Sequence, residues 1–246
     1  MDESDLPADL RLLWEQRDRP RRGPKSAVNL ESVVQAAIEL ADAEGLDQLS
    51  MSRVSERLGF TTMAVYRYVK SKDDLLTHMG DAANQVPPKP TPRAWRRGLE
   101  HWARGIQANY RAHPWMTRLP VTGPPIGPRQ LAWMETGLAN LAATGLREDE
   151  KLAVIQTIHG YVRGEAQFSA ELLRAARNQP PPTVTYGQAL RLVTAEDSHP
   201  AIHQLLESGV LDEPTDYTDA DFEFGLQRIL DGVDRLVTRG LDPRRD

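Results

Sequence analysis

Residues 49–76 decide the fold, and they read LSMSRVSERLGFTTMAVYRYVKSKDDLL. Ser50 is a good helix N-cap, and the apolar residues after it recur at helical spacing as far as Leu58. Gly59 tolerates a positive φ, so it can close this first helix in a tight turn. A second short run follows at once, with Thr61 as its candidate N-cap. The spacing predicts two short helices joined by a tight turn, which is a helix-turn-helix.

The flanking residues extend this unit to four helices. Asn29 is a good N-cap for an earlier helix with one apolar stripe, which ends at Gly45. The helix after the turn is expected over residues 62–69, with its two valines facing inward. Ser71 opens a fourth helix in a capping-box-like pattern, with Asp in place of the usual Glu three residues later.

The helix over 62–69 begins with small or polar side chains, as a helix must if it is to approach base edges in a DNA groove. A threonine or alanine methyl can meet a thymine methyl, and a threonine hydroxyl can bond a base or a phosphate. Tyr66 is expected on the exposed face, because it cannot face inward together with Val65 and Val69 on so short a helix. The residue types therefore indicate these candidate DNA contacts: Thr61, Thr62, Met63, Ala64, Tyr66, Arg67 and, for a phosphate, Lys72.

The charge is unevenly distributed along the chain. The formal net charge of −5, taken alone, argues against a nucleic-acid binder. However, residues 17–25 and residues 53–72 each hold five basic side chains and one acidic side chain, whereas residues 2–15 are acidic. Two basic clusters in an acidic protein favour an electrostatic partner such as DNA, although ordinary solvated faces would also be basic.

These residues resemble the DNA-binding half of Tet-repressor (TetR) family transcriptional regulators. The counterparts of that family's motif are Ser50 before its second helix, Gly59 at its turn, Tyr66 in its third helix and the run Lys70-Ser-Lys-Asp-Asp-Leu75. The Ala- and Glu-rich stretch over 36–46 also matches the family's first helix. The resemblance covers residues 29–80 strongly, and beyond them it rests on length and helicity.

The resemblance implies a homodimer that places its third helices in successive major grooves of a near-palindromic operator. It also implies a small-molecule effector, bound in the C-terminal helical domain, whose binding moves the fourth helix and separates the two DNA-binding domains of the dimer. A hydrophobic or aromatic compound is the expected effector. By family position, Tyr66 and Lys72 would contact phosphates. The full set of DNA contacts that the resemblance implies is Ser52, Arg53, Thr62, Met63, Tyr66 and Lys72.

The rest of the chain predicts an all-α protein. We expect a flexible, basic-ended arm over 1–26, a helix-turn-helix domain over 27–80, and a larger helical ligand-binding and dimerisation domain over 81–246. No alternating strand pattern of useful length occurs anywhere. The helices expected in the last part span about 95–112, 128–143, 148–177, 186–195, 200–208 and 218–239.

The candidate effector site combines apolar and polar side chains, because small-molecule sites are mostly apolar with a few placed polar groups. The helix over 148–177 carries polar residues at 3–4 spacing beside apolar ones. An exposed polar stripe on an amphipathic helix would look the same, and aromatic residues such as these more often belong to a core than to a ligand site. The candidates are Trp102, Ile106, Trp133, Gln156, His159, Arg163 and Phe168.

Composition and motifs exclude several classes of function. The chain has no cysteine, so disulfides, thiolate metal sites and a Cys nucleophile are excluded. It shows neither a signal-peptide pattern nor a long apolar run, which predicts a cytoplasmic protein away from the membrane. His199 and His203 form an i, i+4 pair without a third ligand, so we expect no metal and no other cofactor.

Two other functions compete with a regulator. A helical module that binds or sequesters a small molecule, without operator function, is the main alternative, and the basic run over 53–72 argues against it. An enzyme is the second alternative. No Gly-rich phosphate loop, nucleophile elbow or zinc-protease motif is present, so we expect no catalytic activity.

Overall fold

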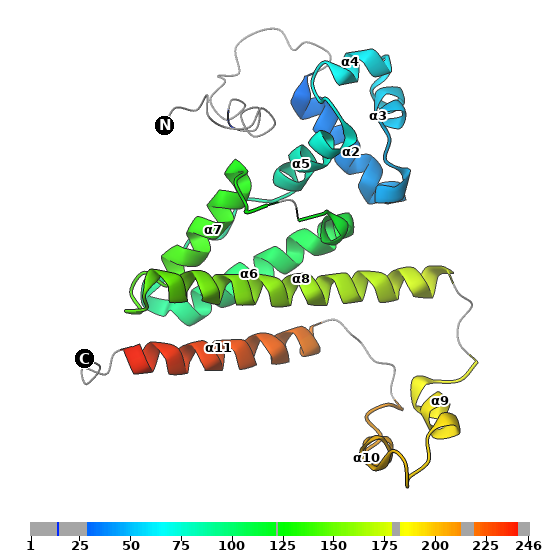
Figure 1. Cartoon of the computed structure of the whole chain (residues 1–246), viewed down its shortest axis with the longest axis vertical. Helices are drawn as coiled ribbons and strands as arrows, with labels where there is room; N and C mark the ends of the chain where they lie inside the picture. Colours follow the sequence, from blue (N-terminus) through cyan, green and yellow to red (C-terminus); the bar gives the residue numbers. More distant parts are fainter. Residues whose placement is uncertain (1–13, 15–28, 122, 179–182, 213–218, 241–246) are drawn as a thin grey trace. The chain divides into compact units, whose positions relative to one another are not determined.

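The computed structural model describes residues 14, 29–121, 123–178, 183–212 and 219–240, and the arm expected over 1–26 lies outside these residues apart from Trp14. Within them every regular element is helical, which confirms the all-α prediction (Figure 1). Short 3₁₀ turns occur at Leu46–Gln48 (η2), Pro92–Ala94 (η3) and Pro114–Arg118 (η4). The α-helices are α2 (Leu30–Glu44), α3 (Met51–Leu58), α4 (Thr62–Tyr66), α5 (Lys72–Ala82), α6 (Trp95–Ala112), α7 (Pro128–Asn140), α8 (Glu148–Asn178), α9 (Tyr186–Val193), α10 (Pro200–Glu207) and α11 (Ala220–Gly240).

Most helix ends lie where the capping residues predict them. Asn29 accepts a hydrogen bond from the Ser32 backbone, and the Ser32 hydroxyl lies 3.0 Å from the Asn29 backbone nitrogen, which completes a capping box. Ser50 accepts from the backbone N–H of the third residue of α3, and Gly59 ends that helix with φ 72°. Ser71 caps α5 in the same way. These local signals fix the borders of the first helices.

Two details of the prediction for the third helix are wrong. Thr61 makes no side-chain capping bond, and α4 ends at Tyr66 instead of residue 69. After Tyr66 the chain tightens into a turn, in which the Tyr68 N–H donates to the Val65 carbonyl at 2.9 Å. Aromatic and β-branched residues have low helix propensity, and the chain must extend at once to reach the next cap at Ser71.

Helices α2 to α5, residues 30–82, form a unit with its own core, which we call the reading head (Figure 1). Helix α2 packs on α3 and α5, and α3 packs on α4. Both valines expected to face inward, Val65 and Val69, are fully buried, as are Val54 and Leu75. Burying four such side chains contributes about 1.5–3 kcal/mol each, which holds α4 firmly although it has fewer than two turns.

A buried carboxylate joins the reading head to the helices that follow it. Asp81, at the end of α5, is 4% exposed and accepts the backbone N–H groups of Arg129 and Gln130, both at 3.0 Å. These N–H groups lie in the first turn of α7, where a helix attracts a negative charge. A Cβ atom on Gly127 would clash with the Asp81 carboxylate, so only glycine leaves room for it.

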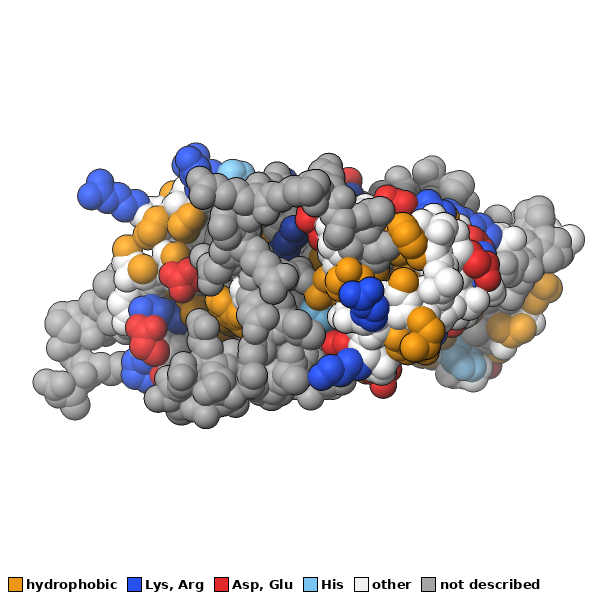
Figure 2. Space-filling view, turned by 90° about the horizontal axis from the view of Figure 1, so that it is seen from above, with side chains coloured by type: hydrophobic (Ala, Val, Ile, Leu, Met, Phe, Trp, Pro, Cys, Tyr) orange, Lys and Arg blue, Asp and Glu red, His pale blue; other side chains and the backbone are white. Residues whose placement is uncertain are grey.

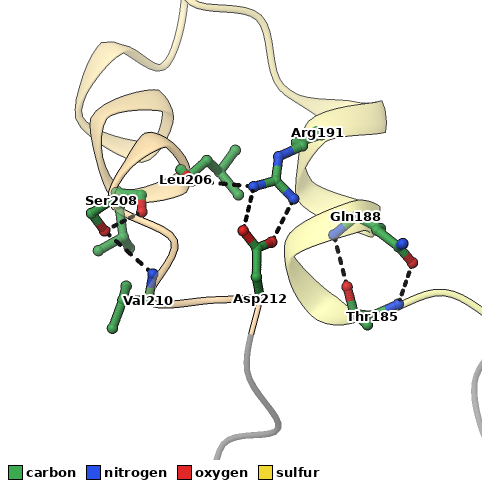
Figure 3. Close-up of polar contacts among 8 residues, drawn as sticks. Thr185, Gln188, Arg191, Leu206, Ser208, Val210 and Asp212 are labelled. Atoms are coloured by element: carbon green, nitrogen blue, oxygen red, sulfur yellow. Dashed lines mark hydrogen bonds and ion pairs between the residues drawn. The ribbon is translucent and has the colours of Figure 1, made fainter.

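The chain divides into two compact units, one of residues 1–167 and 228–246 and one of residues 168–227, which we describe separately. In the second unit, α9 is fastened to the turn after α10 (Figure 3). Arg191 donates to both carboxylate oxygens of Asp212, at 2.7 and 3.0 Å, and to the Leu206 carbonyl. A capping box between Thr185 and Gln188 starts α9.

Candidate nucleic-acid interface and effector site

The outer face of α4 is exposed, as the sequence predicts for a helix that reads DNA. Met63 is 75% exposed and Tyr66 is 46% exposed. Thr61 is also exposed, whereas Thr62 and Ala64 are half-buried. Seen from above, hydrophobic and basic side chains lie close together on the described surface (Figure 2). A protruding methionine and tyrosine beside basic groups can contact base edges and phosphates.

Two of the expected contacts on α3 already have protein partners. The Ser52 hydroxyl donates to Glu56 at 3.0 Å. Arg53 forms an ion pair with Glu44 at 2.6 Å and a longer hydrogen bond, 3.3 Å, to the Gln48 side chain. Sequence reasoning missed this pairing, since Glu44 lies nine residues away on another helix. The ion pair holds the Arg53 guanidinium in one orientation, and a DNA phosphate that binds Arg53 would share the guanidinium with Glu44.

The start of α5 supplies the phosphate site that the sequence predicts around Lys72. Lys72 is exposed in the first turn of α5, and Arg67, five residues earlier at the end of α4, is also exposed. The Asp74 carboxylate, however, accepts the Lys70 backbone N–H at 2.7 Å instead of closing the expected capping box on Ser71. The two basic side chains therefore offer the positive charge, while Asp74 is turned into the reading head, where it is buried.

Three of the expected effector-site residues lie in the core formed by α6 and α7. Trp102, Ile106 and Trp133 are each 6% exposed or less. The Trp102 indole donates to the Trp133 carbonyl at 2.8 Å, and the Trp133 indole donates to the Gln85 carbonyl at 2.7 Å. Both indole N–H groups thus donate to backbone carbonyls of the protein itself. Gln156 and Phe168 are exposed, and Phe168 belongs to the second unit.

The other two, His159 and Arg163, come together with Tyr110 of α6. The Tyr110 hydroxyl lies 3.4 Å from His159 Nε2, and their ring centroids are 6.4 Å apart. Burial raises the pKa of Tyr110, an effect that the Arg163 charge opposes. Partial desolvation of the His159 ring, together with the same charge, lowers the pKa of His159, although that residue keeps exposed surface. The partner of Tyr110 lies on α8, and spacing within one helix could not have predicted it. The cluster is a neutral phenol and imidazole beside a cation.

Arg163 also contacts the segment between α6 and α7. Its Nη2 donates to the carbonyls of Thr117 and Leu119, at 3.1 and 2.9 Å. This segment, residues 113–119, contains η4 and is called the connecting segment below. Because it touches α8 through Arg163, a change at the cluster reaches the connecting segment directly.

The connecting segment is fastened to the reading head at its other side. Asp42 of α2 accepts the Trp115 indole N–H at 2.6 Å, and His113 Nδ1 lies 2.9 Å from the same carboxylate. Arg118 donates to both oxygens of Asp47, at 2.7 and 3.0 Å. Sequence reasoning missed both acids, because their partners are about 70 residues away. Asp42 and Asp47 thus attach the reading head to the connecting segment through hydrogen bonds and ion pairs.

Two features are absent from the described residues, namely a cluster of metal-ligand side chains and a helix that could span a membrane. In the ranges that the structure describes, no three His, Cys, Asp or Glu side chains lie close enough to hold a metal ion together. His199 Nδ1 lies 2.8 Å from the Ser198 hydroxyl, and His203 Nε2 lies 3.4 Å from the Thr194 hydroxyl. None of the helices described has the length and apolar character needed to cross a membrane.

Two family models match this chain in succession. The model of bacterial regulatory proteins of the tetR family matches residues 33–79, and that of the tetracyclin repressor-like C-terminal domain matches residues 87–237. The first of these matches includes α3, α4 and nearly all of α5, and the second begins shortly after α5.

Relatives and solved structures agree with these matches. The HTH-type transcriptional repressor DrrR1 of Streptomyces coeruleorubidus is 38% identical over 243 residues, which is 96% of this chain and 88% of that protein. The HTH-type transcriptional repressor Rv1353c of Mycobacterium tuberculosis is 28% identical, over 90% of this chain and 85% of its own length. The crystal structure of apo ActR from Streptomyces coelicolor shares the fold, with a TM-score of 0.71, 22% identity and coverage of 88% of this chain and 99% of ActR. The chain belongs to the TetR family and is a helix-turn-helix transcriptional repressor.

Proposed function

We propose that this ligand-responsive repressor acts in the cytoplasm as a homodimer in which each copy places α4 in a major groove of a near-palindromic operator. The observation that carries this proposal is the outer face of α4, where Met63 and Tyr66 protrude while Val65 is fully buried behind them. Arg67 and Lys72 supply positive charge next to this face. The bases would be read from the start of α4, and Tyr66 and Lys72 would hold phosphates.

The homodimer is supported by apolar surface in residues 168–227. More than half of the large apolar side chains that are exposed in the described residues come from this short unit, among them Leu192, Val193 and Phe224. Monomeric soluble proteins rarely expose large contiguous apolar patches, and such surface marks contact with another chain. A second copy of this chain satisfies the symmetry of a near-palindromic operator.

The effector is proposed to bind on the C-terminal side of the reading head, near His159 and Arg163. A solved structure of ActR in complex with actinorhodin has a TM-score of 0.70 and 24% identity to this chain. We infer that a compound with aromatic rings is bound here too. Effector binding and operator binding would then oppose each other by the same free energy.

Binding of the purified protein to a duplex of its own promoter region tests the operator function. We expect tight binding that weakens steeply between low and high salt, because phosphate contacts release counterions. Tyr66→Ala should lower the affinity about tenfold because it removes a hydrogen bond to a phosphate, and its melting temperature should stay close to that of the wild type. Val86→Ala, which removes an exposed apolar side chain outside both the reading head and residues 168–227, is the control. Unchanged operator affinity in a folded Tyr66→Ala dimer would contradict the assigned interface.

A further inference from the structure

We propose that the effector is an aromatic carboxylate, which pairs with Arg163 and thereby detaches the connecting segment from α8. This inference rests on the proposed function, and it adds the chemical class of the ligand and the route by which binding reaches the reading head. Three observations carry it. Arg163 has no acidic partner in the described residues. Its Nη2 atom donates to two carbonyls of the connecting segment, and that segment bonds to the reading head.

Arg163 is a half-buried cation whose counter-ion is missing from the described part of the chain. Its hydrogen bonds there go to two neutral carbonyl groups, and no carboxylate lies within ion-pair distance of it. Arginines elsewhere in the same unit are paired with acids, for example Arg118 with Asp47. Leaving a partly buried charge without an opposite charge is costly, so this position favours an anion.

The neighbours of Arg163 leave the positive charge uncompensated. His159 has a pKa below its usual value and Tyr110 a pKa above its usual value, so both are neutral at pH 7. Neither side chain can therefore neutralise the guanidinium. Tyr110 is only 8% exposed, whereas His159 is exposed, so the imidazole is the ring of this pair that a ligand can reach. An acid with an aromatic body matches this combination of a cation and an accessible ring.

The geometry of a guanidinium makes the bound acid compete with the connecting segment. Arginine holds a carboxylate with two parallel N–H groups, and each edge that can do so includes one N–H of Nη2. In the structure Nη2 serves the Thr117 and Leu119 carbonyls. A bidentate carboxylate must therefore replace at least one of these carbonyls, which loosens the connecting segment.

The loosened segment is the one that holds the reading head. Trp115 and Arg118 attach it to Asp42 and Asp47, which lie at the end of α2 and in η2. A displacement of residues 117–119 therefore acts on the position of α2. An uncharged ligand of the same shape cannot form the charged pair with Arg163 that displaces the carbonyls, so it would bind without moving the connecting segment.

The experiment uses a panel of aromatic carboxylic acids with one to four fused rings, each paired with its uncharged carboxamide. Each compound is added at millimolar concentration to the full-length protein, first alone in a thermal-shift assay and then with a labelled promoter duplex in an anisotropy assay. We expect at least one acid to raise the melting temperature and release the duplex, while its carboxamide does neither. The proposal is overturned if no acid does so, or if carboxamides act as well as their acids.

Variants of Arg163 connect the response to this side chain. Arg163→Met should lower the affinity for the active acid about tenfold or more, since a charge-assisted pair is removed. Arg163→Lys keeps the charge without the two-pronged geometry and should show a smaller loss, which protects the test if the methionine variant folds poorly. Arg97→Met removes an exposed arginine of α6 and should leave acid binding unchanged. An unchanged acid affinity in folded Arg163→Met would refute the site.

Asp42→Ala tests the route to the reading head. This variant should bind the active acid, in the absence of DNA, within about twofold of the wild type, because Asp42 bonds to His113 and Trp115 and not to the carbonyls that Arg163 holds. The ratio of operator affinities without and with acid should fall toward one. An unchanged ratio would refute the route. In each case the acid-free operator affinity reports separately on the proposed function, so a protein that binds its operator but ignores every acid disproves only the inference.

Discussion

The reading head and residues 168–227 use their apolar side chains in opposite ways. In the reading head, residues such as Val54, Val65 and Leu75 are fully buried, and the exposed apolar residues are concentrated on and beside α4. In residues 168–227, Leu192 and Val193 of α9 are more than 75% exposed although their helix is well formed. The first region therefore has a core of its own, whereas the second leaves much of its apolar surface exposed.

This contrast teaches where each region obtains its stability. The short helix α4 holds its shape because buried valines and leucines anchor it. Helices α9 and α10 are joined by polar contacts, chiefly the exposed Arg191–Asp212 pair (Figure 3). Exposed ion pairs contribute little to stability, so this pair adds little to the stability of the second region.

The largest expected effect concerns a buried leucine compared with an exposed one. Leu75→Ala in α5 should lower the free energy of unfolding by about 2–5 kcal/mol, because it opens a cavity in a fully buried site. Leu192→Ala in α9 should change it by about 0.5 kcal/mol or less when measured at concentrations where the chain is monomeric. Urea unfolding measures both. Equal losses would show that the two regions are packed alike.

The next effect separates DNA contact from overall charge. Lys72→Ala should weaken operator binding and reduce the slope of log affinity against log salt by about one for each phosphate that the variant no longer neutralises. Lys89→Ala, an exposed lysine outside the reading head, should change neither quantity. A titration at four salt concentrations gives both values. A reduced slope in Lys89→Ala with a normal slope in Lys72→Ala would place the DNA elsewhere.

A smaller effect depends on pH at the junction of the reading head with α7. Burial raises the pKa of Asp81, although the backbone N–H groups of Gln130 and Arg129 oppose this. The folded state then binds the proton more tightly than the unfolded state, so stability falls as pH rises from the unfolded pKa through the folded one. Asp81→Asn removes this titration and keeps an oxygen acceptor for α7.

The measurement is the melting temperature of both proteins at pH 4 and pH 7.5. The melting temperature of the variant, relative to that of the wild type, should rise from pH 4 to pH 7.5, because only the wild type carries the buried negative charge at pH 7.5. A relative melting temperature that falls as pH rises would mean that the two N–H groups lower the Asp81 pKa by more than burial raises it.

The smallest effect is local to the second region. Arg191→Met removes the ion pair with Asp212 and the bond to the Leu206 carbonyl. Global unfolding should stay unchanged because the pair is exposed, while amide exchange over residues 183–212 should become faster. The exchange rates of the reading head serve as the internal control. A large drop in global stability would show that this pair supports the whole fold.

The sequence predicted the features that depend on neighbouring residues. The caps at Asn29, Ser50 and Ser71, the turn at Gly59 and the inward valines of α4 all follow from spacing within about ten residues. The exposure of Tyr66 followed from the same reasoning. The early end of α4 was missed, since its boundary depends on how the chain reaches the next helix.

The candidate effector site was less predictable because its contacts join distant parts of the chain. Arg163 was identified from polar spacing on one helix, but its carbonyl partners lie more than 40 residues away. Trp133, another effector-site candidate, is buried, and its indole N–H donates to the Gln85 carbonyl. Such pairings come from tertiary packing, which the periodicity of a single helix does not encode.

Hydrogen exchange of the full-length protein, with and without its operator duplex, tests most directly whether the reading head binds DNA and residues 168–227 do not. We predict that the duplex slows exchange over residues 50–75, with the strongest change at the start of α4, and leaves α9 and α10 unchanged. Slower exchange over residues 183–212, with no change over residues 50–75, would contradict the account.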